Sequence, residues 1–226
     1  MSERRGVVQG RLEVLTAQTL QGGGAMDGQR WELKFDMKPA TRAKLQATGL
    51  RVLAPLTASK GRYQLRVAAG NDNLAGGVVF DLDVPDFDKP FVMSGLLVGS
   101  AQSDAILTVN PSNTGMIPGV TSVVPTTGRD FSQQDVLRIY TELYDDKASP
   151  TDFSGHAELR DGRGKVVMSK PLERVPGEHG LLEGFRMWVT LPLAGVPAGT
   201  YALQVHGRSG DDKDRRGTRS LLVRVK

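Results

Sequence analysis

The residues that could carry out catalysis or bind a metal are few and scattered in this sequence. The chain has no cysteine, which excludes disulfides, thiolate metal ligands and cysteine nucleophiles. Its histidines, His156, His179 and His206, are far apart and form no HExxH motif, so their spacing does not predict a zinc site. No serine lies in a GxSxG motif. The sequence therefore indicates no reaction, and we expect no catalytic activity and no cofactor.

The segment GRGK at 162–165 is the nearest approach to a phosphate-binding loop. Leu159 stands where a P-loop has its first glycine, and Val166 follows the lysine where serine or threonine is required. The segment separates AELR from KVVMS, and both of these flanks have strand character. We interpret it as the turn of a β-hairpin.

One acidic cluster contains enough carboxylates to be considered for calcium, which prefers hard oxygen ligands. Its members are Asp81, Asp83, Asp86 and Asp88. Against a calcium site, Pro85 interrupts the segment and no glycine makes an EF-hand turn. Asp81 and Asp83 are also the outward half of an alternating strand. We expect exposed carboxylates here, with calcium as the weaker alternative.

Aromatic residues of the C-terminal half are the best candidates for a binding surface. In GFRMWVTLPL the apolar residues at every second position predict one buried face, which places Trp188 on the opposite face. In DVLRIYTELY, Tyr140 and Tyr144 likewise point away from the Leu/Ile face if the segment is a strand. An exposed group of these three residues could anchor a protein partner or stack on a sugar. The alternative is that they pack against the first domain or against the long segment 101–131.

Period-two alternation predicts that the elements carrying these residues are strands. Trp31-Glu32-Leu33-Lys34-Phe35-Asp36 is one example, and 27 glycines and 12 prolines interrupt such runs at the spacing of an all-β fold. Helix is expected only at Pro39–Thr48, which Gly49 ends. The segment 135–144 fits both helical and strand spacing, and we assign it to a strand because it is rich in β-branched and aromatic residues.

A repeated motif predicts two similar domains. Gly61-x-Tyr63-x-Leu65-x-Val67 is answered by Gly199-x-Tyr201-x-Leu203-x-Val205, and each copy follows a Pro-Leu pair and precedes a polar loop and a strand. The pattern is similar to the tyrosine corner of immunoglobulin-like sandwiches, in which the ring is buried and the hydroxyl bonds to backbone. We therefore expect two tandem immunoglobulin-like antiparallel β-sandwiches, at 1–87 and 88–226, with a long 101–131 loop in the second.

Charge and hydropathy exclude several classes of partner. The net charge is +4, from 29 basic and 25 acidic residues of closely alternating sign, which is not the pattern of a nucleic-acid-binding face. No apolar run approaches the ~18 residues of a membrane-spanning helix. The N-terminal MSERRGVVQGRLEVL has no apolar segment of a signal peptide.

The run GRYQLRVAAGNDNLAGGVVFDLDVPDF, followed by FVMSGLLV, resembles the region after the von Willebrand factor A domain in VWFA-related proteins of Acidobacteria. The later RDFSQQDVLRIYTELYDD and PLAGVPAGTYALQV are similar to the second half of that region. The resemblance implies a non-catalytic, extracytoplasmic part of a longer, exported bacterial protein. The metal motif of the A domain, D-x-S-x-S, is absent from this sequence, so no metal-binding residue is implied.

Two functions are consistent with these observations. The first is a structural and protein-interaction module that binds a protein partner or a neighbouring domain. The second is a carbohydrate-binding module that uses Trp188, Tyr140 and Tyr144 to bind a polysaccharide.

Overall fold

The protein has an all-β fold, as the alternation predicted. The computed structural model describes residues 2–4, 7–23, 27–111, 123–146, 153–179 and 184–226, and it is about 60% strand and 7% helix. Contacts divide the chain into two units between Asp86 and Phe87, and a short segment around β9 (Leu107–Val109) belongs with the first unit. No helix in the described part of the chain has the length and apolar character needed to cross a membrane.

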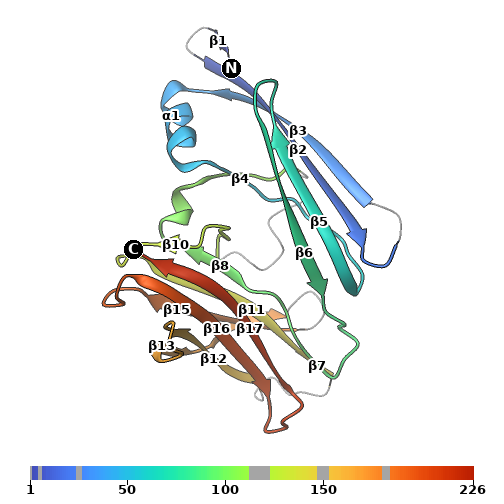
Figure 1. The fold of residues 1–226 in the computed structure, drawn as a ribbon, viewed down its shortest axis with the longest axis vertical. Helices are drawn as coiled ribbons and strands as arrows, with labels where there is room; N and C mark the ends of the chain where they lie inside the picture. Colours follow the sequence, from blue (N-terminus) through green and yellow to red (C-terminus); the bar gives the residue numbers. More distant parts are fainter. Residues whose placement is uncertain (1, 5–6, 24–26, 112–122, 147–152, 180–183) are drawn as a thin grey trace. The chain divides into compact units, whose positions relative to one another are not determined.

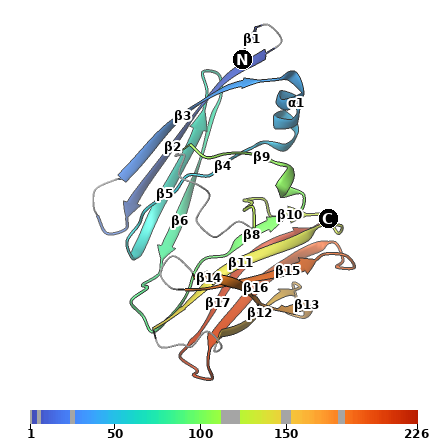
Figure 2. The ribbon, with the colours of Figure 1, turned by 180° about the vertical axis from the view of Figure 1, so that it is seen from behind.

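The first unit is built around one antiparallel sheet (Figures 1 and 2). Its central strands are β2 (Val7–Leu20) and β5 (Gly61–Gly70), and its outer strands are β3 (Asp27–Met37) and β6 (Ala75–Val84). A short strand, β1 (Ser2–Arg4), pairs with the start of β2. A second, two-stranded sheet joins β4 (Leu50–Val52) to β9 in parallel. The described residues of this unit do not form the two facing sheets expected of a sandwich.

The main sheet of the first unit has one charged and one apolar face. Because side chains alternate along a strand, the register that places Val14 opposite Trp31 and Ala69 puts the apolar positions of all four strands on one face. The other face carries ion pairs such as Arg11–Glu32 and Arg30–Glu13. Burial on the apolar face is greatest along β2 and decreases toward β6.

The helix expected at Pro39–Thr48 is present as α1, and its end follows the predicted chemistry. Gly49 has φ of 80°, and its N–H donates to the Leu45 carbonyl oxygen at 2.8 Å. A backbone in this left-handed region favours glycine, so Gly49 ends the helix and allows the chain to turn into β4. The prediction for 135–144 is also confirmed, since this segment forms strand β11 (Val136–Asp145).

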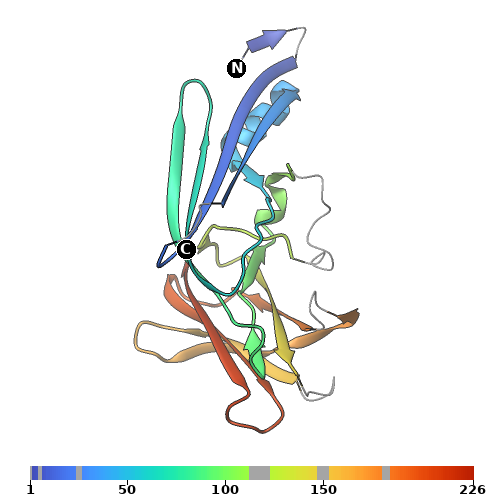
Figure 3. The same cartoon turned by 90° about the vertical axis from the view of Figure 1, so that its right-hand side faces the viewer.

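The second unit contains two five-stranded sheets and a closed core. Figure 3 shows the red C-terminal strands and the yellow β11 in separate layers. One sheet has the order β10-β17-β16-β12-β13, and the other has β14-β15-β11, with β7 and β8 both paired to β11. Together the two sheets enclose a core that includes 19 buried residues in the described part of the chain. The remaining bounds are β7 (Phe91–Met93), β8 (Leu97–Ser100), η1 (Ser103–Ala105), β10 (Asp130–Phe131), β12 (Phe153–Arg160), β13 (Val166–Pro171), β14 (Glu173–His179), β15 (Phe185–Pro192), β16 (Gly199–Ser209) and β17 (Arg216–Val225).

Tyr201 has the geometry expected of a tyrosine corner. Its ring is buried, and its hydroxyl donates to the Pro197 carbonyl oxygen at 2.8 Å, just before the start of β16 at Gly199. Its counterpart Tyr63 is only half-buried, and no hydrogen bond of its hydroxyl occurs within the described residues. Gly61, two residues before Tyr63, has φ of 144°, and a Cβ there would lie 2.9 Å from the Leu20 side chain. In the first copy of the motif, position 61 therefore requires glycine because of its backbone conformation, but the corner hydrogen bond of the tyrosine is missing among the described residues.

The segment 101–131, expected to be a long loop, contains regular structure at both ends. It carries η1 and β9 near its start and β10 at its end, and β10 pairs in parallel with β17. Residues 112–122 lie outside the described part of the chain.

Candidate functional site

The three aromatic residues singled out from the sequence lie on one face of the β11–β15 pair, but they do not form an exposed platform. The inward residues Phe185, Met187, Val189 and Leu191 are buried, as predicted, and Trp188 faces the other way, opposite Tyr140 on β11. Tyr140, however, is only 4% exposed, because Val123, Leu97 and Val175 pack around it. The prediction of an exposed side chain is therefore wrong for Tyr140. The alternative interpretation, packing against the segment 101–131, is correct for this residue, because Val123 of that segment covers it. Trp188 and Tyr144 are half-buried.

Tyr140 and Tyr144 hold a buried carboxylate. The Tyr140 hydroxyl donates to Glu142 Oε1 at 2.5 Å, and the Tyr144 hydroxyl donates to Glu142 Oε2. Arg186 lies across the strand pair with its Nε 3.6 Å from Glu142 Oε1. Burial and these bonds to Glu142 raise the pKa of both phenols above the ordinary value of a tyrosine. Two phenols and a guanidinium thus offset the cost of burying the Glu142 carboxylate. Tyr140 and Tyr144 therefore have a structural role.

The acidic cluster does not converge on a shared point. Asp81 and Asp83 are exposed on the charged face of β6, and Asp86 pairs with Lys60 at 3.2 Å. Asp88 is also exposed. Within the described residues, one group of three or more His, Asp or Glu side chains has ligand atoms close enough to share an ion, and it contains none of these aspartates.

The edge strand β6 carries the most exposed run of apolar residues in the first unit. Val78, Val79 and Phe80 are 65%, 63% and 61% exposed. Val78 and Phe80 continue the apolar face of the sheet, whereas Val79 lies on the opposite face. On the Val79 side, small residues of all four strands, such as Ala17 and Gly77, border a hollow of about 470 Å³. The run Val78–Phe80 is therefore exposed on both faces of β6.

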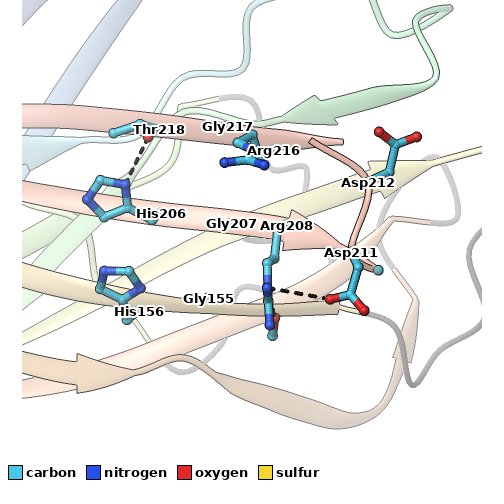
Figure 4. A pocket seen from close by; sticks show the side chains of 12 residues that line it. Gly155, His156, His206, Gly207, Arg208, Asp211, Asp212, Arg216, Gly217 and Thr218 are labelled. Atoms are coloured by element: carbon cyan, nitrogen blue, oxygen red, sulfur yellow. Dashed lines mark hydrogen bonds and ion pairs between the residues drawn. The ribbon is translucent and has the colours of Figure 1, made fainter. Parts of the chain in front are cut away.

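A second hollow, of about 520 Å³, lies on the outer face of β12, β16 and β17 in the second unit, and most of the side chains that line it are polar or charged (Figure 4). The pairing of β12 with β16 places His156 directly opposite His206, and the two imidazoles stack with centroids 4.7 Å apart. His206 Nε2 is 3.1 Å from Glu158 Oε1, and its Nδ1 is 2.9 Å from Thr218 Oγ1. Arg208 extends along the hollow toward Asp211, with a closest approach of 3.8 Å.

This cluster was missed from the sequence because it depends on strand pairing. His156 and His206 are 50 positions apart, and only the β12–β16 register brings them together. Glu158 is two residues beyond His156, so both side chains share the outer face of β12. The alternation of Glu158 and Arg160 with Ala157 and Leu159 predicts that face, but nothing local predicts its neighbour.

Comparisons with known proteins give little further information. No protein-family model matches the chain, and no curated protein matches it. Among solved structures, the β-glucuronidase of Parabacteroides merdae is similar at a TM-score of 0.33 and 11% identity, covering 95% of this chain and 25% of the enzyme. A second structure of that enzyme, with glycerol in its active site, has the same TM-score and 10% identity. The chain thus spans about a quarter of the length of the enzyme.

Proposed function

We propose that the chain is a non-catalytic protein-interaction module, and that its first unit binds an extended segment of a protein partner along β6. The observation that carries the proposal is the exposure of Val78, Val79 and Phe80 on a strand that forms one edge of the sheet. An edge strand presents unpaired backbone N–H and C=O groups along its free side, which can form hydrogen bonds with an added strand.

Several features that protect edge strands from pairing are missing from β6. Its first half, Ala75–Phe80, contains no charge and no proline, and its register with β5 is continuous, without a bulge. Charges begin only at Asp81. The first half is therefore the part most open to an added strand.

The side chains of β6 favour a partner of defined chemistry. An added strand would place alternate side chains beside Val78 and Phe80 on the apolar face, where burial of apolar groups is favourable. On the other face it would pass Val79 and, beyond the first half of β6, Asp81 and Asp83, beside which lysine or arginine fits best. We therefore expect an extended partner segment that alternates apolar residues with basic or neutral polar ones.

The proposal is tested with a short peptide in which valine alternates with lysine and threonine. We expect the peptide to slow hydrogen exchange of β6 amides, measured by NMR, because added hydrogen bonds protect them. Replacing both Val78 and Phe80 with lysine should abolish this protection. The matched control is Val167→Lys, an exposed valine on β13, the edge strand of a sheet in the second unit, which should leave it unchanged.

Two results would contradict the proposal. If the peptide leaves β6 exchange unchanged, the edge does not accept this kind of strand. If sedimentation shows a dimer that the lysine variant breaks, β6 pairs with a second copy of the chain instead. Carbohydrate binding on Trp188, Tyr140 and Tyr144 has less support because Tyr140 is buried, and titration with polysaccharides while following Trp188 fluorescence tests it separately.

A further inference from the structure

We propose that His156, Glu158 and His206 form a binding site for Zn²⁺ or a similar transition-metal ion on the outer face of the second unit. Their ligand atoms all lie within 4.8 Å of one another. Ligands bound at ~2.1 Å to one tetrahedral ion lie ~3.4 Å apart, so the three groups must close by at most ~1.4 Å. His156 is exposed, so we expect its side chain to be free to rotate toward the other two ligands.

The donor set selects the class of ion. Two imidazoles and one carboxylate are ligands that zinc accepts, whereas calcium and magnesium prefer oxygen ligands alone. Three protein ligands leave a fourth position, and the hollow beside the histidines gives water or a small ligand access to it.

The carboxylate of Glu158 is held in a fixed position within the cluster by its neighbours. Its side chain is only 6% exposed, and Arg160 Nε lies 2.7 Å from its Oε1. A guanidinium and an imidazole therefore fix the orientation of this carboxylate on the face of β12 that His156 shares.

Thr218 is placed as a positioning residue for His206. Nε2 of His206 lies beside the Glu158 carboxylate and Nδ1 beside the Thr218 hydroxyl, and in the tautomer protonated at Nε2 the ring donates to Glu158 and accepts from Thr218. When Nε2 binds an ion, the single ring proton resides on Nδ1 and the Thr218 oxygen becomes its acceptor. The same pair of partners thus supports both tautomers, and such outer contacts orient metal-bound imidazoles.

The test is titration of the untagged full chain with ZnCl₂ by calorimetry, together with Co²⁺ absorption spectra. We expect one ion per chain and the visible absorption of four-coordinate Co²⁺, with no response to CaCl₂ or MgCl₂. His156→Gln, His206→Gln and Glu158→Gln should each weaken Zn²⁺ binding by about 100-fold, and Thr218→Val by about 10-fold. Ser220→Ala removes a hydroxyl from the next outward position of β17 and should change nothing.

The proposal is overturned if the wild-type chain shows no saturable binding at about 0.1 mM free Zn²⁺. It is also overturned if His156→Gln, at an exposed position where folding is not at risk, binds Zn²⁺ as tightly as the wild type. Urea midpoints of the variants show whether each remains folded. None of these outcomes depends on β6, so this site and the proposed protein-binding edge can fail separately.

Discussion

The same motif is buried to different degrees in the two units. In the second unit Tyr201, Leu203 and Val205 are 5%, 0% and 0% exposed, whereas the matching residues of the first unit are all half-buried. Those residues are Tyr63, Leu65 and Val67. The two strands have the same pattern, so the difference arises from their surroundings. The second unit pairs two five-stranded sheets around a core, whereas the described part of the first unit has one five-stranded sheet and one two-stranded sheet.

The number of buried apolar residues follows the same division. Among the described residues, the buried apolar residues of the first unit are only Val8, Val14 and Met37. All other buried apolar residues belong to the second unit. Since apolar burial is the main favourable contribution to folding, we expect most of the stability in the second unit and the more adaptable surface in the first.

The largest expected effect is a separation of the two unfolding transitions. Trp31 lies in the first unit and Trp188 in the second, so Trp188→Phe and Trp31→Phe leave one fluorescent reporter in each. We expect Trp31 to report a urea midpoint at least ~1 M below that reported by Trp188, because less surface is buried around it. The intact chain followed by circular dichroism is the control. One common midpoint for both reporters would show that the units unfold together.

The next comparison truncates the same motif position in each unit. Leu203→Ala should lower the free energy of unfolding by ~3 kcal/mol, since Leu203 is fully buried and leaves a cavity. Leu65→Ala should cost ~1 kcal/mol, because Leu65 is only half-buried and solvent can fill the space. Urea titration of both variants measures the difference. Equal costs would mean that the first unit is packed as tightly as the second.

A smaller effect is expected from the corner hydroxyls. Tyr201→Phe deletes the hydrogen bond to Pro197 and leaves that carbonyl without its partner, so it should cost ~1 kcal/mol in the free energy of unfolding. Tyr63→Phe should change that free energy by less than ~0.5 kcal/mol, as typical surface substitutions do. If the two variants lose the same stability, the first unit has a tyrosine corner after all.

The smallest effect concerns two surface carboxylates, one in each unit. Hydrogen bonds from Arg224 and then Lys226 lower the pKa of Asp130 from 3.8 to about 2, and a hydrogen bond from Arg30 lowers the pKa of Glu13. Because the folded-state pKa of Asp130 lies below the unfolded value, its stabilising contribution is full above pH 4 and is lost as pH falls through about 2.

NMR titration of the carboxyl carbons measures these values directly. Arg224→Gln should raise the pKa of Asp130 toward 3.8 and leave Glu13 unchanged, while Arg30→Gln should do the reverse. A wild-type Asp130 that titrates at 3.8 would show that its pairing is screened by solvent.

Local chemistry was sufficient to predict the elements from the sequence. Alternation predicted the strands, Pro39 and Gly49 bounded the helix, and the Asp161–Gly164 turn formed the expected hairpin, in which Gly164 has φ of 80° and Asp161 Oδ1 accepts from two backbone N–H groups. Each of these signals acts over a few residues, through backbone conformation or side-chain period, so the sequence alone determines it.

The tertiary structure decided which faces are covered and which residues meet. Alternation places Tyr140 opposite the core face of β11, but whether that outer face is exposed depended on Val123, a residue of the segment 101–131. In the same way, only the β12–β16 register brings His156 to His206. Neither contact can be predicted from nearby residues, because strand pairing and covering segments join residues that are far apart in the chain. Side-chain alternation with a period of two distinguishes the two faces of a strand but does not identify the neighbours of either face.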